Sequence, residues 1–195
     1  FAKAMAAATG KPLVGVNHLE GHLSASFMID GIEPPEFPYV GLAVSGGHTS
    51  IYLVEGWGRL KLLGRTLDDA AGEAFDKAAS MLGLSYPGGV VIDRISRGRN
   101  VAAVGFPRPM LRESTMNMSF SGLKTALKRH LETLPATPDA DQTAEIAASF
   151  QEAVVDILVA RTVGAAVSTG VRDVVIAGGV AANSRLRERM DLACR

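Results

Sequence analysis

The sequence predicts an α/β fold, and three features of the chain lead to that prediction. Three short apolar segments between residues 39 and 63 are separated by tight glycine turns, as in an antiparallel meander. Segments with helical spacing of apolar residues follow between residues 69 and 170. A further apolar strand at 173–177 leads through a diglycine turn into another helix. Three antiparallel strands followed by alternating helices and strands are typical of the ribonuclease-H-like plan.

The meander is predicted from strand-forming residues interrupted by glycine. Residues 39–44 are apolar, and the turn at 45–48 contains two glycines. Residues 49–54 are rich in β-branched side chains, and a Gly-Trp-Gly turn at 56–58 precedes a third strand at 60–63. An earlier apolar run, 12–16, is predicted as a buried strand.

The predicted helices share a stripe of apolar residues three or four positions apart, which suits one face packed on a core. In the longest helix this stripe includes Ile146, Phe150 and Val154. Prolines and polar residues make 100–121 irregular. The segments predicted as helices are 1–8, a short one after Asn17, 69–82, 91–97, 122–134, 141–170 and 183 onward.

Composition limits the classes of function. The chain has 195 residues, of which 47% are hydrophobic, and 20 basic residues balance 20 acidic ones. No overall positive field therefore attracts nucleic acid, and such a partner needs a local basic patch. Cys194 is the only cysteine, which excludes a disulfide framework and a multi-cysteine zinc site. No apolar run approaches the roughly 18 residues of a membrane span, so we expect a cytoplasmic protein without membrane contact.

Both ends of the chain fall inside predicted helices. The sequence starts at Phe1 without Met and stops at Arg195. We therefore expect a fragment of a longer protein.

A histidine pair is the first candidate for chemistry. Asn17 is a good N-cap, with Glu20 placed as in a capping box, so a helix should begin at His18. His18 and His22 are four residues apart and share one face, which lets both imidazoles reach one metal ion. A polar helix face explains the same spacing equally well. A zinc protease is disfavoured, because its glutamate directly follows the first histidine.

Two glycine turns are the second candidate. The turn Ser45-Gly46-Gly47-His48 joins two strands, and its backbone N–H groups are suited to a phosphate or carboxylate. His48 itself either donates to a substrate or caps the turn. The segment 178–183 leads from a strand to a helix and offers bare backbone to a flat ligand. Either turn alone is also explained as an ordinary tight turn, but the two together resemble the nucleotide-binding segments of the actin-like ATPase superfold.

Seven motifs in order make the resemblance specific. The motifs are HLEGH at 18–22, VSGGHT at 44–49, DDAAGEAFDK at 68–77, YPGG at 86–89, FPRP at 106–109, FSGLKT at 120–125 and AGGVAAN at 177–183. With these motifs the chain resembles the tRNA threonylcarbamoyladenosine transferase family, formerly called O-sialoglycoprotein endopeptidases, and its bacterial branch fits best. The likeness extends from Val14 to Arg195.

The resemblance implies a metal-dependent acyltransferase. Members transfer threonylcarbamoyl from its adenylate to the N6 amine of the adenosine beside the anticodon, in tRNAs that read codons beginning with A. The resemblance also implies two parts of the chain. Residues 1–30 would be a remnant of the first lobe with the metal-ligand helix, and residues 31–195 would be the second actin-like lobe. That lobe would carry a helical insertion around 90–135 and be truncated at its C-terminus, so the fragment itself should be inactive. Implied partners are tRNA, the adenylate, a scaffold paralogue and a small ATPase.

The resemblance also implies site residues. His18 and His22 match the histidine ligands of one metal ion, iron or alternatively zinc, whose third aspartate ligand lies outside this chain. Val90 stands where the family has proline, which loosens the placement of Asp93. The positions that match substrate-binding residues are Ala43, Val44, Ser45, Gly46, Gly47, Asp76, Gly89, Asp93 and Asn183.

Two other classes of protein remain as alternatives. A small-molecule kinase or ATPase of the same superfold would share both glycine turns but has no need of the histidine pair. A non-catalytic scaffold paralogue should lack that pair.

Two groups of basic residues are candidates for tRNA contact. One is the basic strip Lys124, Lys128 and Arg129, and the other is formed by the arginines between 94 and 112.

Overall fold

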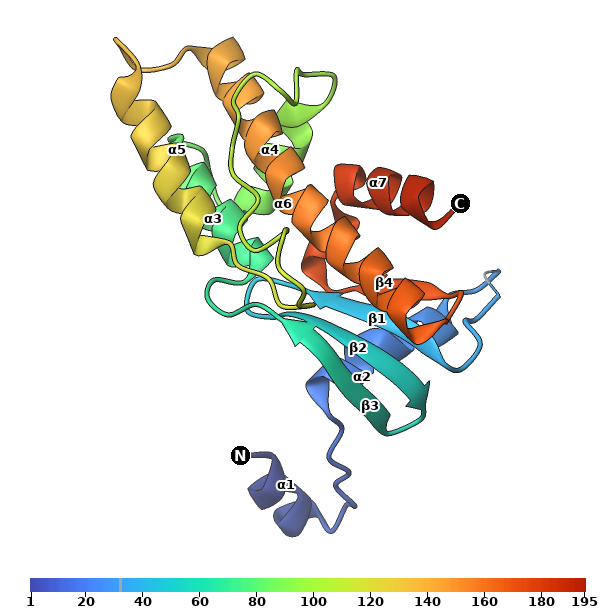
Figure 1. The fold of residues 1–195 in the computed structure, drawn as a ribbon. Coiled ribbons are helices and arrows are strands. Elements are labelled where there is room, and N and C mark those ends of the chain that lie inside the picture. The colour runs from blue at the N-terminus through green and yellow to red at the C-terminus, as the bar shows by residue number, and fades with distance from the viewer. Residues whose placement is uncertain (32) are drawn as a thin grey trace.

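The computed structural model describes residues 1–31 and 33–195, and its centre is a four-stranded sheet (Figure 1). The order of the strands is β3-β2-β1-β4. β1 (Tyr39–Val44), β2 (Thr49–Gly56) and β3 (Arg59–Arg65) form the predicted antiparallel meander, whereas β4 (Val174–Ala177) joins β1 in parallel. This mixed sheet with its helices confirms the α/β, ribonuclease-H-like and actin-like fold class.

β1 is buried along its whole length, because both faces of the sheet are covered. Val40, Leu42 and Val44 face the main core, which they share with the helices that follow the meander. Tyr39 and Ala43 point to the opposite face, where they pack with Leu23. Alternate residues of a strand point to opposite faces, so a strand covered on both sides reads as the continuous apolar run found here.

The helices after the meander gather around one long helix. α6 (Ala140–Thr169) lies across the sheet with its C-terminal half, while α3 (Ala71–Met81), α4 (Gly88–Ser96) and α5 (Ser121–Thr133) surround its N-terminal half (Figure 1). α7 (Ser184–Cys194) packs beside α6. The predicted helices are confirmed to within three residues at their ends, the largest shift being α4, which begins at Gly88.

The N-terminal segments lie apart from this body. α1 (Ala2–Thr9) buries none of its residues and stands away from the sheet at the end of an extended linker (Figure 1). α2 (His18–Ser24) and the short 3-10 helix η1 (Ala25–Met28) run along the face of the sheet opposite α6. The predicted division between residues 30 and 31 stays a prediction.

The prediction of a buried strand at 12–16 is wrong. Val14 is 80% and Val16 72% exposed, and the segment is not assigned to any strand. A strand is stabilised by a partner that pairs with its backbone, and none of the described strands lies beside this segment.

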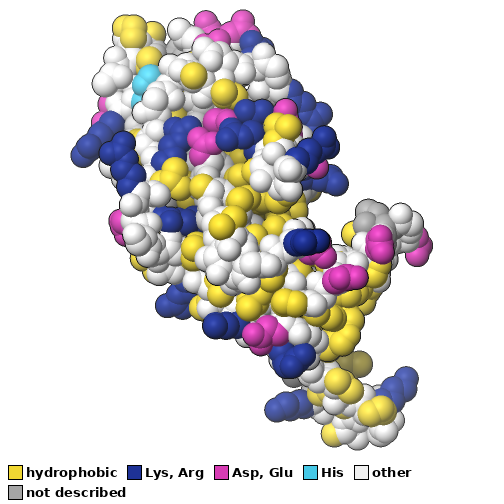
Figure 2. Space-filling view, turned by 45° about the vertical axis from the view of Figure 1, so that its right-hand side comes forward, with side chains coloured by type: hydrophobic (Ala, Val, Ile, Leu, Met, Phe, Trp, Pro, Cys, Tyr) yellow, Lys and Arg dark blue, Asp and Glu magenta, His cyan; other side chains and the backbone are white. Residues whose placement is uncertain are grey.

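Charged side chains of both signs are mixed on the surface. Figure 2 shows basic and acidic side chains interspersed over one face instead of a single basic stripe, which agrees with the balanced composition. No helix among the described residues is long and apolar enough to cross a membrane.

Candidate functional site

A cavity of about 460 Å³ brings together five of the nine predicted substrate-binding residues. It lies where the β1–β2 turn, α3, the start of α4 and the segment after β4 meet. The five are Gly46, Asp76, Gly89, Asp93 and Asn183. Ala43 and Val44 are instead buried in β1, and Ser45 and Gly47 lie in the adjoining turn without lining the cavity.

The glycines around this cavity are of two kinds. A Cβ atom at Gly72 would lie 2.6 Å from the Ser45 carbonyl oxygen, and one at Gly178 would clash with the Val44 carbonyl group. These two are therefore glycine because backbone packs on backbone. A Cβ at Gly46 or Gly179 would meet no atom within 4 Å, although both residues line the cavity. Protein packing does not require glycine there, so the free space is available to a ligand.

Asp76 is oriented by the helix opposite it. One of its carboxylate oxygens accepts a hydrogen bond from the Gly88 N–H at 2.8 Å, at the first residue of α4. No hydrogen bond involves its other oxygen among the described contacts, and the residue lines the cavity. A carboxylate held at one oxygen is suited to accept from a hydroxyl group of a ligand.

Asp93 and Asn183 are engaged within the protein. Asp93 accepts from the backbone N–H and hydroxyl of Ser184, at 3.0 and 2.6 Å, and pairs with Arg97. Asn183 caps α7 through the Leu186 N–H at 2.9 Å and donates to Gln151 at 2.8 Å. The two side chains therefore connect the start of α7 to the helices beside the cavity, Asp93 from α4 and Asn183 through Gln151 of α6.

α7 is held more firmly by ion pairs with α6. Glu152, whose side chain is 8% exposed, pairs with Arg185 at 2.6 Å and with Arg189. Burial alone would raise the pKa of Glu152, but the hydrogen bond and charge of Arg185, with the charges of Arg189 and Arg108, lower it below its usual value. The wall that carries Gly179 and Asn183 is therefore anchored to the core helix.

The histidines lie on the other side of the β1–β2 turn. The Asn17 side chain accepts from the N–H groups of Leu19 and Glu20, which confirms the N-cap, and the rings of His18 and His22 are 4.5 Å apart between centroids. Glu20 forms no capping box. Its carboxylate instead accepts from the Gly58 N–H at 2.7 Å and ties α2 to the β2–β3 turn.

The pair fits two ligands of one metal ion. Rings of two imidazoles that bind the same ion at about 2.0–2.1 Å must lie side by side, as these do. The described residues contain no group of three imidazole, carboxylate or thiol side chains that would hold an ion. A complete metal site therefore requires a ligand beyond this pair.

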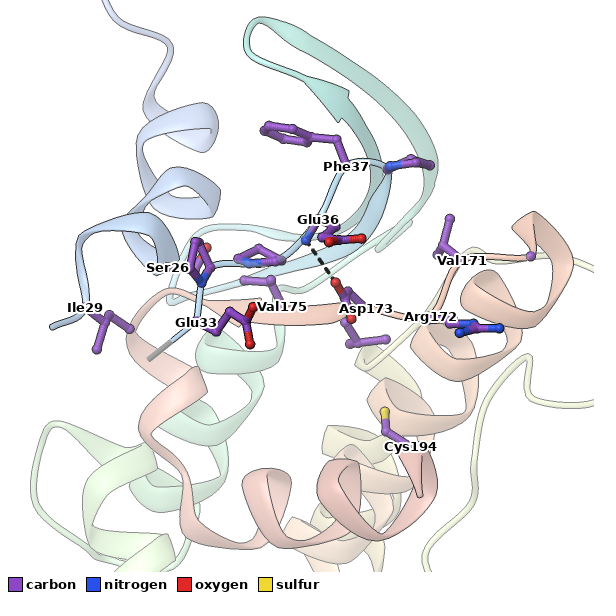
Figure 3. A pocket seen from close by; sticks show the side chains of 15 residues that line it. Ser26, Ile29, Glu33, Glu36, Phe37, Val171, Arg172, Asp173, Val175 and Cys194 are labelled. Carbon is purple, nitrogen blue, oxygen red and sulfur yellow. Dashed lines mark hydrogen bonds between the residues drawn. The ribbon is translucent and has the colours of Figure 1, made fainter. Parts of the chain in front are cut away.

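A larger cavity lies elsewhere in the described part of the chain. It measures about 820 Å³ and lies along the start of β4, between residues 33–38 and the end of α7 (Figure 3). Asp173 accepts from the Glu36 N–H across it at 2.9 Å, and Cys194 borders it. None of the predicted site residues lines it.

Some residues that line the smaller cavity were not predicted as site residues. Phe75 forms an apolar wall, while Tyr86, Val90 and Arg97 stand at its edge. Tyr86 is 83% and Val90 66% exposed. The YPGG motif, whose two glycines are the first residues of α4, was the local indication of this edge.

Comparison with known proteins identifies relatives of the whole segment. Residues 1–195 match the family described as TsaD, tRNA N6-adenosine threonylcarbamoyltransferase. Proteins of that name from Geotalea uraniireducens (strain Rf4) and Anaeromyxobacter dehalogenans (strain 2CP-1) are 54% identical over 189 residues and 55% identical over 186 residues. These alignments cover 97% and 95% of this chain, but it spans only 54% and 55% of the relatives.

A solved structure supports the fold. Component A of the (R)-2-hydroxyglutaryl-CoA dehydratase from Acidaminococcus fermentans aligns with a TM-score of 0.52 over 98% of this chain and 63% of its own. At 20% sequence identity the likeness concerns the fold alone. The family match over residues 1–195 and the relatives above 50% identity carry the assignment, and the chain belongs to the tRNA N6-adenosine threonylcarbamoyltransferase family.

Proposed function

We propose that this chain forms the adenylate-binding wall and the histidine ligands of a threonylcarbamoyltransferase that modifies tRNA. The reaction would move a threonylcarbamoyl group from its adenylate to the N6 amine of the adenosine beside the anticodon, in tRNAs that read codons beginning with A. The new C–N bond replaces the bond between the carbamoyl carbon and the phosphate oxygen. AMP leaves with the electron pair, and the amine proton passes to solvent.

The observation that carries the proposal is the pair of glycines facing open space. Gly46 and Gly179 come from turns more than 130 residues apart, and both leave room in one cavity beside Asp76. Backbone without side chains allows a flat base or a phosphate to approach closely. Asp76 would accept from a ribose hydroxyl, and Phe75 and Val180 would contact the apolar face of the base.

The metal of the proposed enzyme would be held by His18 and His22. Iron is the expected ion and zinc the alternative, with an aspartate outside this chain as the third ligand. When bound, the ion would supply a positive charge that polarises the carbamoyl carbonyl. Asn17 and Glu20 position the imidazoles by fixing the start of α2 and its distance from the β2–β3 turn.

Further partners follow from the same proposal. The tRNA, a scaffold paralogue and a small ATPase would bind the complete protein, in the cytoplasm where tRNA is modified. Among basic residues, Lys124 and Arg129 on α5 have no acidic partner in the described ion pairs and are candidates for phosphate contact. A kinase or ATPase of this fold leaves the paired imidazoles of His18 and His22 unexplained.

The nucleotide site is tested by filling the free space. Gly46→Val and Gly179→Val should leave a folded protein but reduce the affinity for AMP by at least tenfold, because the new methyl groups occupy the ligand's volume. Binding is measured by calorimetry on the full-length protein, with circular dichroism to check the fold. Gly105→Val, another glycine with no atom within 4 Å of a Cβ but outside the cavity, is the matched control. Unchanged affinity in the first two variants would remove the turns from the site.

The transfer step is tested separately. His18→Ala in the full-length protein should abolish threonylcarbamoyl transfer to tRNA while AMP affinity stays within about twofold, since the imidazole lies outside the nucleotide cavity. The yield of modified nucleoside and the calorimetric affinity are measured on the same preparation. Full transfer by the variant would refute the role of the histidine pair.

A further inference from the structure

A third imidazole joins the histidine pair from a different part of the chain. The rings of His48, at the end of the β1–β2 turn, and His18, at the start of α2, are 5.8 Å apart between centroids. Three of the four histidines in the sequence are therefore gathered in one place, from segments that are 30 residues apart. His48 is exposed, so the fold does not bury this ring for packing.

The turn does not need the His48 side chain. The Ser45 N–H donates to the His48 carbonyl oxygen at 2.8 Å, and the Ser45 hydroxyl accepts from the His48 N–H at 3.1 Å. Backbone groups and one serine therefore close the turn. No described hydrogen bond involves the imidazole of His48, which leaves both of its nitrogens available to a ligand.

The position of His48 links the two parts of the site. Gly46 lines the nucleotide cavity, and His48 follows it by two residues on the side of the turn that faces α2. No atom lies within 4 Å of a Cβ built at Gly46 or Gly47. The glycines of the turn therefore leave space next to the ring of His48, which in turn neighbours His18.

His48 is not counted with the pair of candidate ligands, because no three side chains among the described residues are grouped to hold an ion. His18 and His22 are 4.5 Å apart, His48 is 5.8 Å from His18, and the described residues form no three-ligand group. We propose that His48 contacts the substrate by hydrogen bonding, through its imidazole, to an oxygen of the acyl group held between the glycine turn and the His18–His22 pair. This inference rests on the proposed function and adds the residue that distinguishes an acylated adenylate from AMP.

The physical basis is the extra polar group of the acylated ligand. AMP ends at the phosphate, whereas the mixed anhydride continues into a carbonyl and a carboxylate, which both accept hydrogen bonds. An imidazole N–H next to the turn would pair with one of them. Its loss should weaken binding of the acylated ligand without changing the contacts of the nucleotide.

The inference is tested by comparing ligands in the full-length protein. The probes are AMP and a stable sulfamoyl adenosine that carries the threonylcarbamoyl group in place of the reactive anhydride. His48→Ala should lower the affinity for the acylated probe about tenfold and leave that for AMP unchanged, and His48→Gln, which keeps a donor, should recover part of the loss. The metal content of both variants should equal that of the unaltered protein.

His130→Ala serves as the matched control, because it removes the fourth histidine, which lies on α5 and packs on Phe106 away from this site. Equal affinity for the acylated probe in His48→Ala would overturn the inference, and so would loss of the metal, which would make His48 a ligand. This test measures binding alone, so its outcome does not depend on whether the unaltered protein transfers threonylcarbamoyl to tRNA. Absence of transfer by the unaltered protein would refute the proposed function and not the role of His48.

Discussion

The two parts of the candidate site are built in different ways. The proposed nucleotide cavity is lined by Gly72 and Phe75, which are both buried, and by a segment that is anchored to α6. The histidine pair stands on a seven-residue helix that is fixed by an N-cap, one side-chain bond to the β2–β3 turn and the packing of Leu23. The cavity is therefore pre-formed by the fold, whereas the position of the two proposed metal ligands depends on a few local contacts.

This difference suggests which properties should be robust. Nucleotide binding should survive changes in α2, since no residue of that helix lines the cavity. Metal binding should respond to changes around α2 that hardly alter global stability, because a short helix with few buried residues opens at low free-energy cost.

The largest effect is expected from a packing glycine. Gly178 has φ +104° and a Cβ there would clash with the Val44 carbonyl group, so Gly178→Val should lower the free energy of unfolding by about 4 kcal/mol or more. Chemical denaturation measures this value. Gly179→Val, one residue further, should change stability by less than about 1 kcal/mol, since its Cβ faces open space. Equal destabilisation by both variants would contradict the division into packing and ligand glycines.

A second prediction concerns the anchor of α7. Glu152→Gln removes the buried carboxylate that Arg185 and Arg189 share, although Arg185 keeps Glu188 and Arg189 keeps Asp156. This change should destabilise the protein by about 3 kcal/mol at pH 7. The pKa of Glu152 is lowered on folding, so the ionised carboxylate contributes stability above its ordinary pKa, and this contribution is lost as the pH falls through the lowered value.

Thermal unfolding at several pH values measures this contribution. The difference in stability between Glu152→Gln and the unaltered protein should be full at pH 7 and shrink below about pH 4, near the usual carboxyl range. Glu145→Gln on the same helix, which has no described ion pair, is the control. A difference that does not change with pH would exclude the ion pairs as its cause.

Much of the fold could be predicted because it depends on local patterns. The strands of the meander and the large helices carry their own periodicity, turns and caps, and they lie where the sequence places them. The meeting of Gly46 and Gly179 in one cavity also follows from the topology, since the carboxyl ends of the parallel strands β1 and β4 lie at the same edge of the sheet.

The contacts that could not be predicted from the sequence are those between residues far apart in the chain. Local spacing places Asp68 at the start of α3, but its carboxylate accepts from Ser119, Phe120 and Ser121 at the start of α5. Glu20 likewise bonds to Gly58 instead of its own helix start. A local sequence pattern does not predict from which distant N–H group a carboxylate will accept a hydrogen bond. The run at 12–16 was mistaken for a strand for the same reason, because a strand is defined by its neighbour.

The third prediction uses this remote cap. Burial raises the pKa of Asp68, but the hydrogen bonds from Ser119, Phe120 and Ser121 outweigh it and lower the pKa. Asp68→Asn should therefore reduce Tm by about 2–4 °C, a modest change because water reaches the site. Differential scanning calorimetry measures the shift, with Asp191→Asn, whose partner Arg195 is exposed, as the control expected to change Tm least. A shift no larger than the control's would show that α5 does not need this cap.

The smallest effect on stability, and the sharpest test of the separation, is expected at α2. Asn17→Ala removes the cap of the ligand helix, which costs about 1 kcal/mol locally. Because His18 is the first residue of that helix, the metal affinity of the full-length protein should fall about fivefold, while Tm and AMP affinity stay unchanged. Metal affinity is measured by competition with a chelating dye. Asn17→Asp, which keeps a capping oxygen, is the matched control and should retain metal binding. If Asn17→Ala weakened AMP binding as much as metal binding, α2 and the cavity would form one unit, and the contrast between the pre-formed pocket and the locally held ligands would be wrong.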